Sequence, residues 1–255
     1  MSNFRLVVRT FLVVLGLIVC VPLHYAWRLA GRMSPWPRRY LWWVGRSVGL
    51  RVRIEGRPLE RDVLFASNHK SWLDILLLGG SAGAAFVSKE EVSRWPAVGW
   101  LARLNDTVFV ARAQRSGVKG QADALRTAVA SGRPVALFPE GTVSAGHAVI
   151  PFRPSLFASL YPALPRARVQ PVAIDYGDAS PEIAWIDGET IVANARRILS
   201  RAGTMRVTLR FLEPVDPHLA GNRKVLAAAA QAEVEAALRP SEVAPPPLYG
   251  RDEDR

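Results

Sequence analysis

Hydrophobic and polar positions divide the chain into an apolar start and a longer region in which strand-like and helical runs alternate. Short runs rich in Val, Ile and Phe are typical of strands, and longer runs with a helical period are typical of helices. This alternation predicts an α/β domain with a mostly parallel central sheet flanked by helices. Strands are expected at 50–56, 62–67, 84–89, 106–112, 134–142 (which runs into a turn), 168–176 and 205–215, and helices at 72–80, 95–105, 120–132 and 223–239.

The apolar start carries no Asp, Glu, Lys or Arg from Thr10 to Trp27. About 18 such residues lie near the lower limit for crossing a bilayer core. Three interpretations stay open: two helices at 4–29 and 37–49 held in one leaflet, a spanning helix, or a cleaved signal peptide. In both uncleaved cases the remainder of the chain works beside lipid.

The net charge of +11 would suit either nucleic acid or an anionic membrane. Its arginines are interleaved with Trp and Tyr near the N-terminus, as expected for a lipid headgroup region, and no nucleic-acid motif is found. We therefore expect a membrane partner and no nucleic acid. One cysteine, Cys20, excludes an internal disulfide. The predicted organisation is membrane-anchoring helices at 1–49, one domain at 50–239 and a disordered tail at 240–255.

The stretch "SNHKSWLD" places His69 five positions before Asp74 at the start of an apolar run. Positions i and i+5 of one helix lie about 140° apart, so the two side chains meet only if His69 lies on the loop before the helix. Ser71 as N-cap, with Asp74 three residues later, predicts that boundary. Asp74 then either only caps the helix or also fixes the imidazole tautomer and leaves the other nitrogen as a general base.

A protein nucleophile for such a base is not found. Thr142 stands where a G-x-S-x-G elbow around Ser144 needs Gly. The other histidines have no metal-ligand spacing, so we expect no metal and no cofactor. The substrate is then expected to supply the hydroxyl, which indicates direct transfer to an acceptor alcohol.

Four blocks in this order resemble the motifs of the glycerophospholipid acyltransferase family, which includes the 1-acylglycerol-3-phosphate acyltransferases. The blocks are "NHKSWLD" (68–74), "DTVFVAR" (106–112), "FPEGT" (138–142) and "VQPVAI" (169–174). The resemblance spans residues 60–215. It implies that His69 is the general base, Asp74 its orienting partner and Arg112 the group that holds the acceptor's phosphate. It further implies acceptor binding by Glu140, Gly141 and Thr142, a membrane or donor entrance at Lys89, and structural roles for Asn68, Ser71, Pro139 and Pro171, the last at a strand end.

The implied reaction moves an acyl group from acyl-CoA or acyl carrier protein to 1-acylglycerol-3-phosphate, giving phosphatidic acid at the cytoplasmic side of a bacterial inner membrane. Asp106 departs from the family pattern, because the second block usually opens with Gly. The stretch "FPEGTVSAGHAVIPFRPSLF" is similar to the branch that acylates lyso-ornithine lipid, so that acceptor or another lysolipid stays an alternative. A lipid-binding module without activity is the alternative from another class.

Overall fold

The computed structural model describes residues 2–110, 123, 125–143, 148–186 and 188–239. Within them, a seven-stranded sheet has the order β1-β7-β6-β2-β5-β3-β4. Every neighbouring pair is parallel except β6 and β7. The mostly parallel sheet predicted from the sequence is therefore confirmed. Its strands are β1 (Leu50–Glu55), β2 (Val63–Ser67), β3 (Ala85–Lys89), β4 (Val108–Val110), β5 (Val135–Leu137), β6 (Arg168–Asp175) and β7 (Met205–Phe211).

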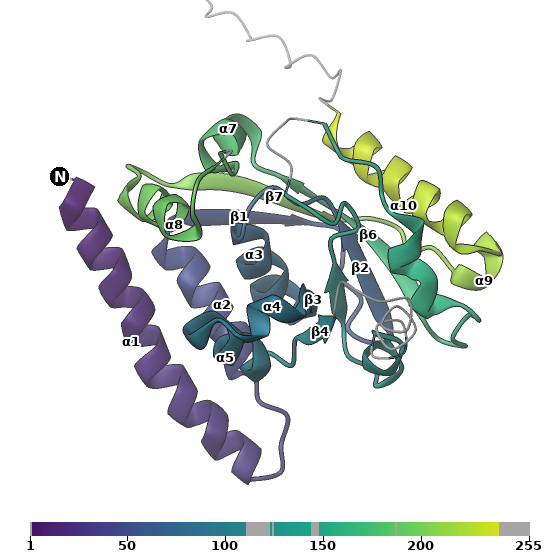
Figure 1. The fold of residues 1–255 in the computed structure, drawn as a ribbon, viewed down its shortest axis with the longest axis horizontal. Helices are drawn as coiled ribbons and strands as arrows, with labels where there is room; N and C mark the ends of the chain where they lie inside the picture. The colour runs from purple at the N-terminus through teal and green to yellow at the C-terminus, as the bar shows by residue number, and fades with distance from the viewer. Residues whose placement is uncertain (1, 111–122, 124, 144–147, 187, 240–255) are drawn as a thin grey trace, which may run out of the picture.

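Helices cover both faces of the sheet (Figure 1). One face carries α3 and α2, with α1 and α8 outside them; the other carries α10, η1 and a helical stretch at 125–130. Of the longer helices, α8 was not expected from the sequence. The bounds are α1 (Ser2–Leu29), α2 (Trp36–Ser47), α3 (Leu73–Ala82), α4 (Glu90–Ser93), α5 (Pro96–Leu104), α7 (Ser180–Ile183), α8 (Ile191–Ser200), α9 (Pro217–Ala220) and α10 (Arg223–Leu238), with 3₁₀ helices η1 (Pro154–Leu160) and η2 (Gly177–Ala179).

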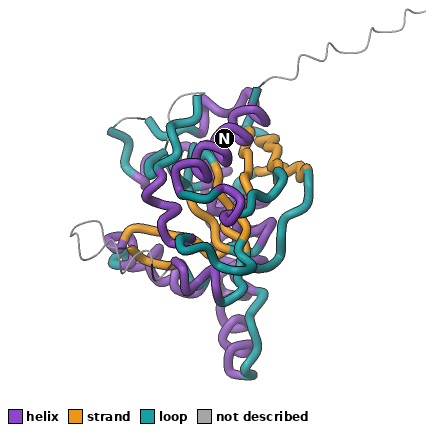
Figure 2. Tube along the Cα trace, turned by 90° about the vertical axis from the view of Figure 1, so that its right-hand side faces the viewer, coloured by secondary structure: helices purple, strands orange, loops and turns teal. Residues whose placement is uncertain are grey.

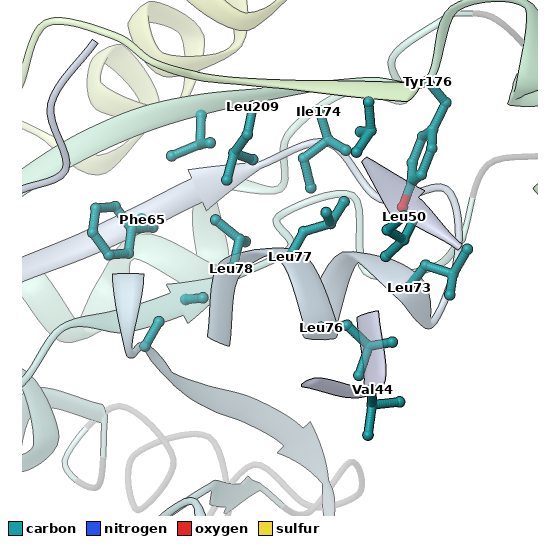
Figure 3. Close-up of a cluster of buried hydrophobic side chains, with 14 of the residues drawn as sticks. Val44, Leu50, Phe65, Leu73, Leu76, Leu77, Leu78, Ile174, Tyr176 and Leu209 are labelled. Atoms are coloured by element: carbon teal, nitrogen blue, oxygen red, sulfur yellow. The ribbon is translucent and has the colours of Figure 1, made fainter. Parts of the chain in front are cut away.

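Strand β2 is buried along its whole length because it supplies both halves of the core. Phe65 faces the cluster formed with α2 and α3, and Leu64 faces the cluster formed with α10. Side chains of a strand alternate between faces, so an unbroken apolar run fits a strand covered on both sides. Figure 3 shows the α3 side, where Leu77 and Leu78 lie under Ile174 and Leu209 of the sheet.

Helix α3 is longer than expected, because Gly79 and Gly80 do not end it. A Cβ on Gly80 would lie 2.9 Å from the backbone nitrogen of Trp42, and one on Gly79 would lie 2.3 Å from Leu41. The two glycines therefore serve the close approach of α2 to α3. The helix ends at Gly83, whose φ of 67° is left-handed.

Helix α1 packs along the body and exposes its other face. The Trp43 indole N–H donates to the Leu12 carbonyl at 2.8 Å, and the Arg9 guanidinium donates to carbonyl oxygens at the end of α8 and beyond. The C-terminal end of α1 and the loop to α2 project from the body (Figure 2). On the outer face Phe4, Phe11 and Ile18 are 73%, 62% and 66% exposed. The helix is long and apolar enough to cross a membrane.

Candidate active site

His69 lies on the loop between β2 and α3, as the sequence predicted. Its Nδ1 lies 2.8 Å from Oδ2 of Asp74. The N-cap of α3 is Trp72, not Ser71, so the helix begins one residue later than expected. Asp74 nevertheless reaches back as in a capping box, because its Oδ2 accepts from the backbone N–H groups of Ser71 at 2.9 Å and Lys70 at 2.7 Å. Capping and pairing are therefore one arrangement.

The Asp74 carboxylate is completely buried. An ionised carboxylate is stable in such a place only when it is paired and hydrogen-bonded. Its second oxygen, Oδ1, accepts from the hydroxyl of Tyr176 at 2.5 Å. Both oxygens are thus satisfied, and the imidazole is held in one orientation with its Nδ1–H on the carboxylate.

The next parallel strand supplies the other wall of the site. Phe138, which follows β5, stacks on the His69 ring with centroids 4.0 Å apart. Glu140 is fully buried and its Oε1 accepts from the backbone N–H of His69 at 3.0 Å. Burial raises the pKa of Glu140 to about 7, although hydrogen bonds from backbone N–H groups and the charge of Lys70 act in the opposite direction. Burial likewise lowers the pKa of Lys70.

The turn after Glu140 carries a cation that the sequence did not single out. Gly141 has a left-handed φ of 73°, and a Cβ there would lie 3.0 Å from the guanidinium carbon of Arg153. The Arg153 backbone N–H donates to the Pro139 carbonyl at 3.0 Å, which ties the chain at 153 to this turn. Thr142 is exposed beside it. Arg153 is itself exposed, so its guanidinium is open to an anion at this edge of the site.

Two of the expected binding residues are not placed here. Arg112 lies outside the described residues. Lys89 ends β3, and its side chain is outside the described part of the chain. Asp106, which stands where the family pattern has Gly, has a φ of 54° and pairs with Arg133. The departure therefore keeps the left-handed backbone that glycine would provide, since Asp tolerates that conformation better than most residues.

Asn68 and Pro171 connect the site loop to β6. Asn68 is fully buried; its Nδ2 donates to the Ile174 carbonyl at 2.9 Å and its Oδ1 accepts from the Ile174 N–H at 2.8 Å. Pro171 lies inside β6, so the strand-end position expected for it is wrong. The ladder between β6 and β7 begins at the next residue, Val172. The proline, which has no N–H to donate, thus stands where that pairing starts.

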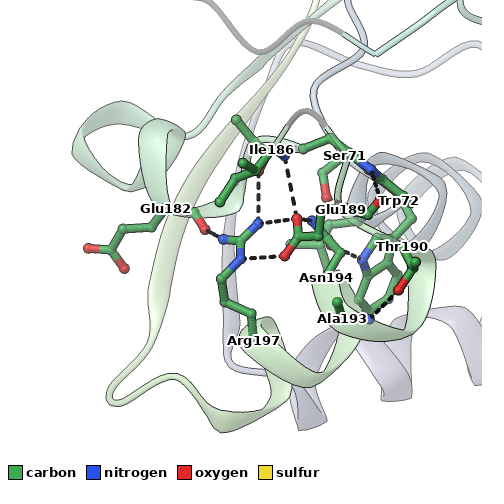
Figure 4. A network of polar contacts seen from close by, with 12 residues as sticks. Ser71, Trp72, Glu182, Ile186, Glu189, Thr190, Ala193, Asn194 and Arg197 are labelled. Carbon is green, nitrogen blue, oxygen red and sulfur yellow. Dashed lines mark hydrogen bonds and ion pairs between the residues drawn. The ribbon is translucent and has the colours of Figure 1, made fainter.

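A polar network holds α8 against the residue before α3 (Figure 4). The Trp72 indole N–H donates to Asn194 at 2.9 Å, and Asn194 donates to Glu189 at 2.7 Å. Arg197 binds both oxygens of Glu189 at 2.8 Å. These bonds, those from Arg197 first, lower the pKa of Glu189 to about 2. The network therefore attaches the end of the β2–α3 loop, at Trp72, to α8.

An apolar cavity of about 790 Å³ lies beside this loop. Drug-sized and lipid-like ligands occupy cavities of about 300–1,000 Å³. Residues of six described helices, α1, α2, α3, α4, α5 and α8, line the cavity. Two lining residues, Trp72 and Ile75, lie just before and just after Asp74 in the chain. Representative lining residues are Cys20 of α1, Tyr40 of α2, Leu76 of α3, Leu101 of α5 and Val192 of α8.

Sequence reasoning missed Tyr176, Phe138, Arg153 and the Trp72 network. Phe138 lies within the "FPEGT" block, but the sequence indicates no role for it. Tyr176 gave no local signal, because it is 102 positions from its partner. No group of three or more His, Cys, Asp or Glu side chains that could hold a metal ion occurs among the described residues.

Comparisons with known proteins point to one family. A family model described as acyltransferase matches residues 50–175. The lyso-ornithine lipid O-acyltransferases of Rhodobacter capsulatus and Brucella abortus are each 34% identical, over 92% and 91% of this chain and 90% and 94% of their own lengths. The 1-acyl-sn-glycerol-3-phosphate acyltransferase of Neisseria gonorrhoeae is 35% identical over 52% of this chain and 51% of its own. The crystal structure of the 1-acyl-sn-glycerophosphate acyltransferase of Thermotoga maritima, 23% identical, has the same fold, with a TM-score of 0.64 over 93% of this chain and 96% of its own.

Proposed function

The chain belongs to the acyltransferase family, and on that premise we propose that it moves a fatty acyl group from a thioester donor to the free hydroxyl of a lysolipid. The observation that carries the proposal is the His69–Asp74 pair at 2.8 Å. Nδ1 is engaged by Asp74, which leaves Nε2 to accept a proton. The His69 side chain is 17% exposed, so a hydroxyl can reach it.

The reaction needs one base and no protein nucleophile. His69 Nε2 takes the proton of the acceptor hydroxyl while the oxygen attacks the thioester carbonyl carbon. The new C–O bond forms, the C–S bond breaks, and the imidazolium returns the proton to the departing thiolate. Asp74 orients the imidazole and stabilises its charged form, as the acid of a catalytic triad does.

Lyso-ornithine lipid is the favoured acceptor, and 1-acylglycerol-3-phosphate is the second candidate. Sequence relatives named for the first match nearly the whole chain at 34% identity. The Neisseria gonorrhoeae relative named for the second matches about half of the chain, and the Thermotoga maritima structure named for it shares the fold at 23% identity. The two headgroups share an anion, a carboxylate in one and a phosphate in the other. Arg153, over the turn at Gly141, is the described cation best placed to hold either, and Arg112 is expected to assist it.

The donor is acyl-CoA or acyl carrier protein, and no cofactor takes part in this proposal. A thioester carries its electrophilic carbonyl at the end of a long apolar chain. We propose that the cavity beside Trp72 accepts that chain, because its walls are almost entirely apolar and its volume lies within the range of small-molecule sites.

The bilayer is the remaining partner of the proposal. The outer face of α1 exposes Phe4, Phe11 and Ile18, while its inner face is held by Trp43 and by bonds from Arg9 to the body. A helix whose first half is bonded to the domain through Arg9 and Leu12 fits insertion into one leaflet better than a free crossing. The proposed location is a bacterial inner membrane with the site facing the cytoplasm, where acyl thioesters are available.

An acceptor panel tests the activity. Purified protein in mixed micelles is given radiolabelled acyl-CoA or acyl carrier protein with lyso-ornithine lipid, lysophosphatidate or glycerol 3-phosphate. We expect transfer to lyso-ornithine lipid with the highest kcat/KM. Absence of transfer to every acceptor from both donors would exclude the proposed activity.

Variants test the mechanism. His69→Ala is expected to lose at least about 10²-fold in kcat, and Asp74→Asn a comparable factor. His218→Ala, at an exposed histidine of α9, is the matched control and keeps wild-type activity. A folded His69→Ala protein with near wild-type activity contradicts the role of His69 as base.

A further inference from the structure

Tyr176 follows β6 and reaches the start of α3 from the sheet. Its ring extends toward Leu73 with the hydroxyl at its tip (Figure 3). The hydroxyl donates to Oδ1 of Asp74 at 2.5 Å, while His69 and two backbone N–H groups occupy Oδ2. We propose that Tyr176 is a positioning residue that sets the basicity of the His69–Asp74 pair through this hydrogen bond. The inference deepens the proposed function and rests on it.

The geometry of β6 makes this bond a fixed feature. Two residues before Tyr176, the backbone of Ile174 is bound on both its N–H and its C=O by the side chain of Asn68. The end of β6 is therefore attached on both sides of His69 in the chain, to Asn68 of the β2–α3 loop before it and to Asp74 of α3 after it. Tyr176 is 3% exposed, so water does not compete for the hydroxyl.

The environment of the Tyr176 hydroxyl favours its protonated form. Burial, and then the charge of Asp74 and the hydrogen bond to it, raise the pKa of Tyr176 well above its ordinary value. Tyr176 is thus a donor to Asp74. A carboxylate that accepts a strong hydrogen bond has less negative charge available for a neighbouring imidazolium.

Other charged groups around the pair act on it at the same time. Lys70, from the same loop, lies close enough to interact with both Asp74 and Glu140, and Glu140 interacts with His69. On the α8 side, Glu189 and Arg197 neutralise each other. Tyr176 differs from all of these because it adds no charge, so its removal changes the hydrogen bonding of Asp74 alone.

The test compares Tyr176→Phe with Tyr161→Phe in the full-length enzyme. Tyr161 packs on the opposite face of the sheet, where its hydroxyl donates to the Pro217 carbonyl at 3.1 Å. In Tyr176→Phe we expect kcat to fall about five- to thirtyfold with KM nearly unchanged, because the Asp74 carboxylate loses one of the bonds that orient it and, through it, the imidazole. The acidic limb of the profile of kcat/KM against pH should move up by roughly 0.3–1 pH unit, because Asp74 then holds the imidazolium more strongly. Tyr161→Phe leaves both unchanged.

A second variant should move the acidic limb of the pH profile in the opposite direction while keeping the shape of the tyrosine side chain. With 3-fluorotyrosine at position 176 the hydroxyl is more acidic and a stronger donor, so the acidic limb should move to lower pH. Opposite movements in the two variants support the proposal. If the acidic limb of the pH profile does not move in either variant, the proposal is overturned, even if Tyr176→Phe lowers stability. A purely structural role changes stability and not the pH profile.

The two proposals fail in different ways. If His69→Ala retains full activity, the proposed mechanism fails and the profile no longer reports this pair. If His69→Ala is inactive while the position-176 variants keep the wild-type profile, the role of Tyr176 alone is refuted. The double variant Asp74→Asn, Tyr176→Phe adds a check: its kcat should equal that of Asp74→Asn, because Tyr176 acts through the carboxylate.

Discussion

Buried Glu140 should make the stability of this protein fall as the pH rises from about 4.5 to about 7. Its pKa is about 7 in the folded chain against an ordinary value of 4.5, because burial disfavours the ionised form. Below 4.5 the group is protonated in both states and adds no penalty; above 7 it is ionised in both and the penalty is complete. A difference of about 2.5 between the pKa values corresponds to roughly 3 kcal/mol at 1.36 kcal/mol per unit.

Glu140→Gln removes the titration, so the free energy of unfolding of the variant minus that of the wild type should grow by roughly 3 kcal/mol between pH 4.5 and pH 8. Any cost of placing the amide is the same at both pH values and cancels. Denaturant unfolding in detergent micelles, followed by tryptophan fluorescence, measures the difference. Glu213→Gln, at an exposed glutamate after β7, should show no such growth. An equal difference at both pH values for Glu140→Gln would refute the reasoning.

Three further predictions concern stability and are checked by thermal or denaturant unfolding. Gly80→Ala should cost about 1–3 kcal/mol, because its Cβ would overlap the α2 backbone, whereas Gly45→Ala, whose Cβ has an ordinary contact at 3.4 Å, should be neutral or stabilising; equal effects would contradict the packing argument. Asn68→Ala should cost about 2–4 kcal/mol by leaving the buried backbone of Ile174 without partners; a loss below about 0.5 kcal/mol would be inconsistent with this. Glu189→Gln should be less stable than the wild type at pH 7, and the gap should close as the pH falls from 4.5 toward 2, because the folded pKa of Glu189 is lowered to about 2; a gap that stays constant would show that the charge is not responsible.

Local spacing was sufficient to place His69 beside Asp74. The separation of five residues excludes a shared helix face, so His69 had to lie on the loop, and the structure has it there. Spacing was not sufficient for helix ends. Two consecutive glycines usually indicate the end of a helix, but Gly79 and Gly80 lie inside α3 because α2 packs against them. A Cβ on Gly80 would lie 2.9 Å from the α2 backbone. No residue near the two glycines in the sequence indicates that contact.

Helix α8 was missed although a signal existed. Thr190 is its N-cap, and its hydroxyl accepts from the Ala193 N–H at 3.2 Å. A threonine followed by an amphipathic run is a helix start. The ion pair between Glu189 and Arg197 could not be predicted from the sequence alone. It forms only because the chain before α8 turns so that Glu189 lies beside that helix.

Sheet order explains why the site is assembled from three distant segments. Strands β6, β2 and β5 are parallel neighbours, and the chain after each supplies one part: Tyr176, the His69 loop and Glu140. Parallel neighbours end at the same edge, so these residues meet whatever their separation in sequence. The register also matters, since β6 aligns Val172 with Ser67 of β2. A slip of one residue would turn every side chain of β6 to the opposite face and take Tyr176 away from α3. The Asn68 bonds to Ile174 oppose such a slip, so a residue with a structural role also preserves the hydrogen bond from Tyr176 to Asp74.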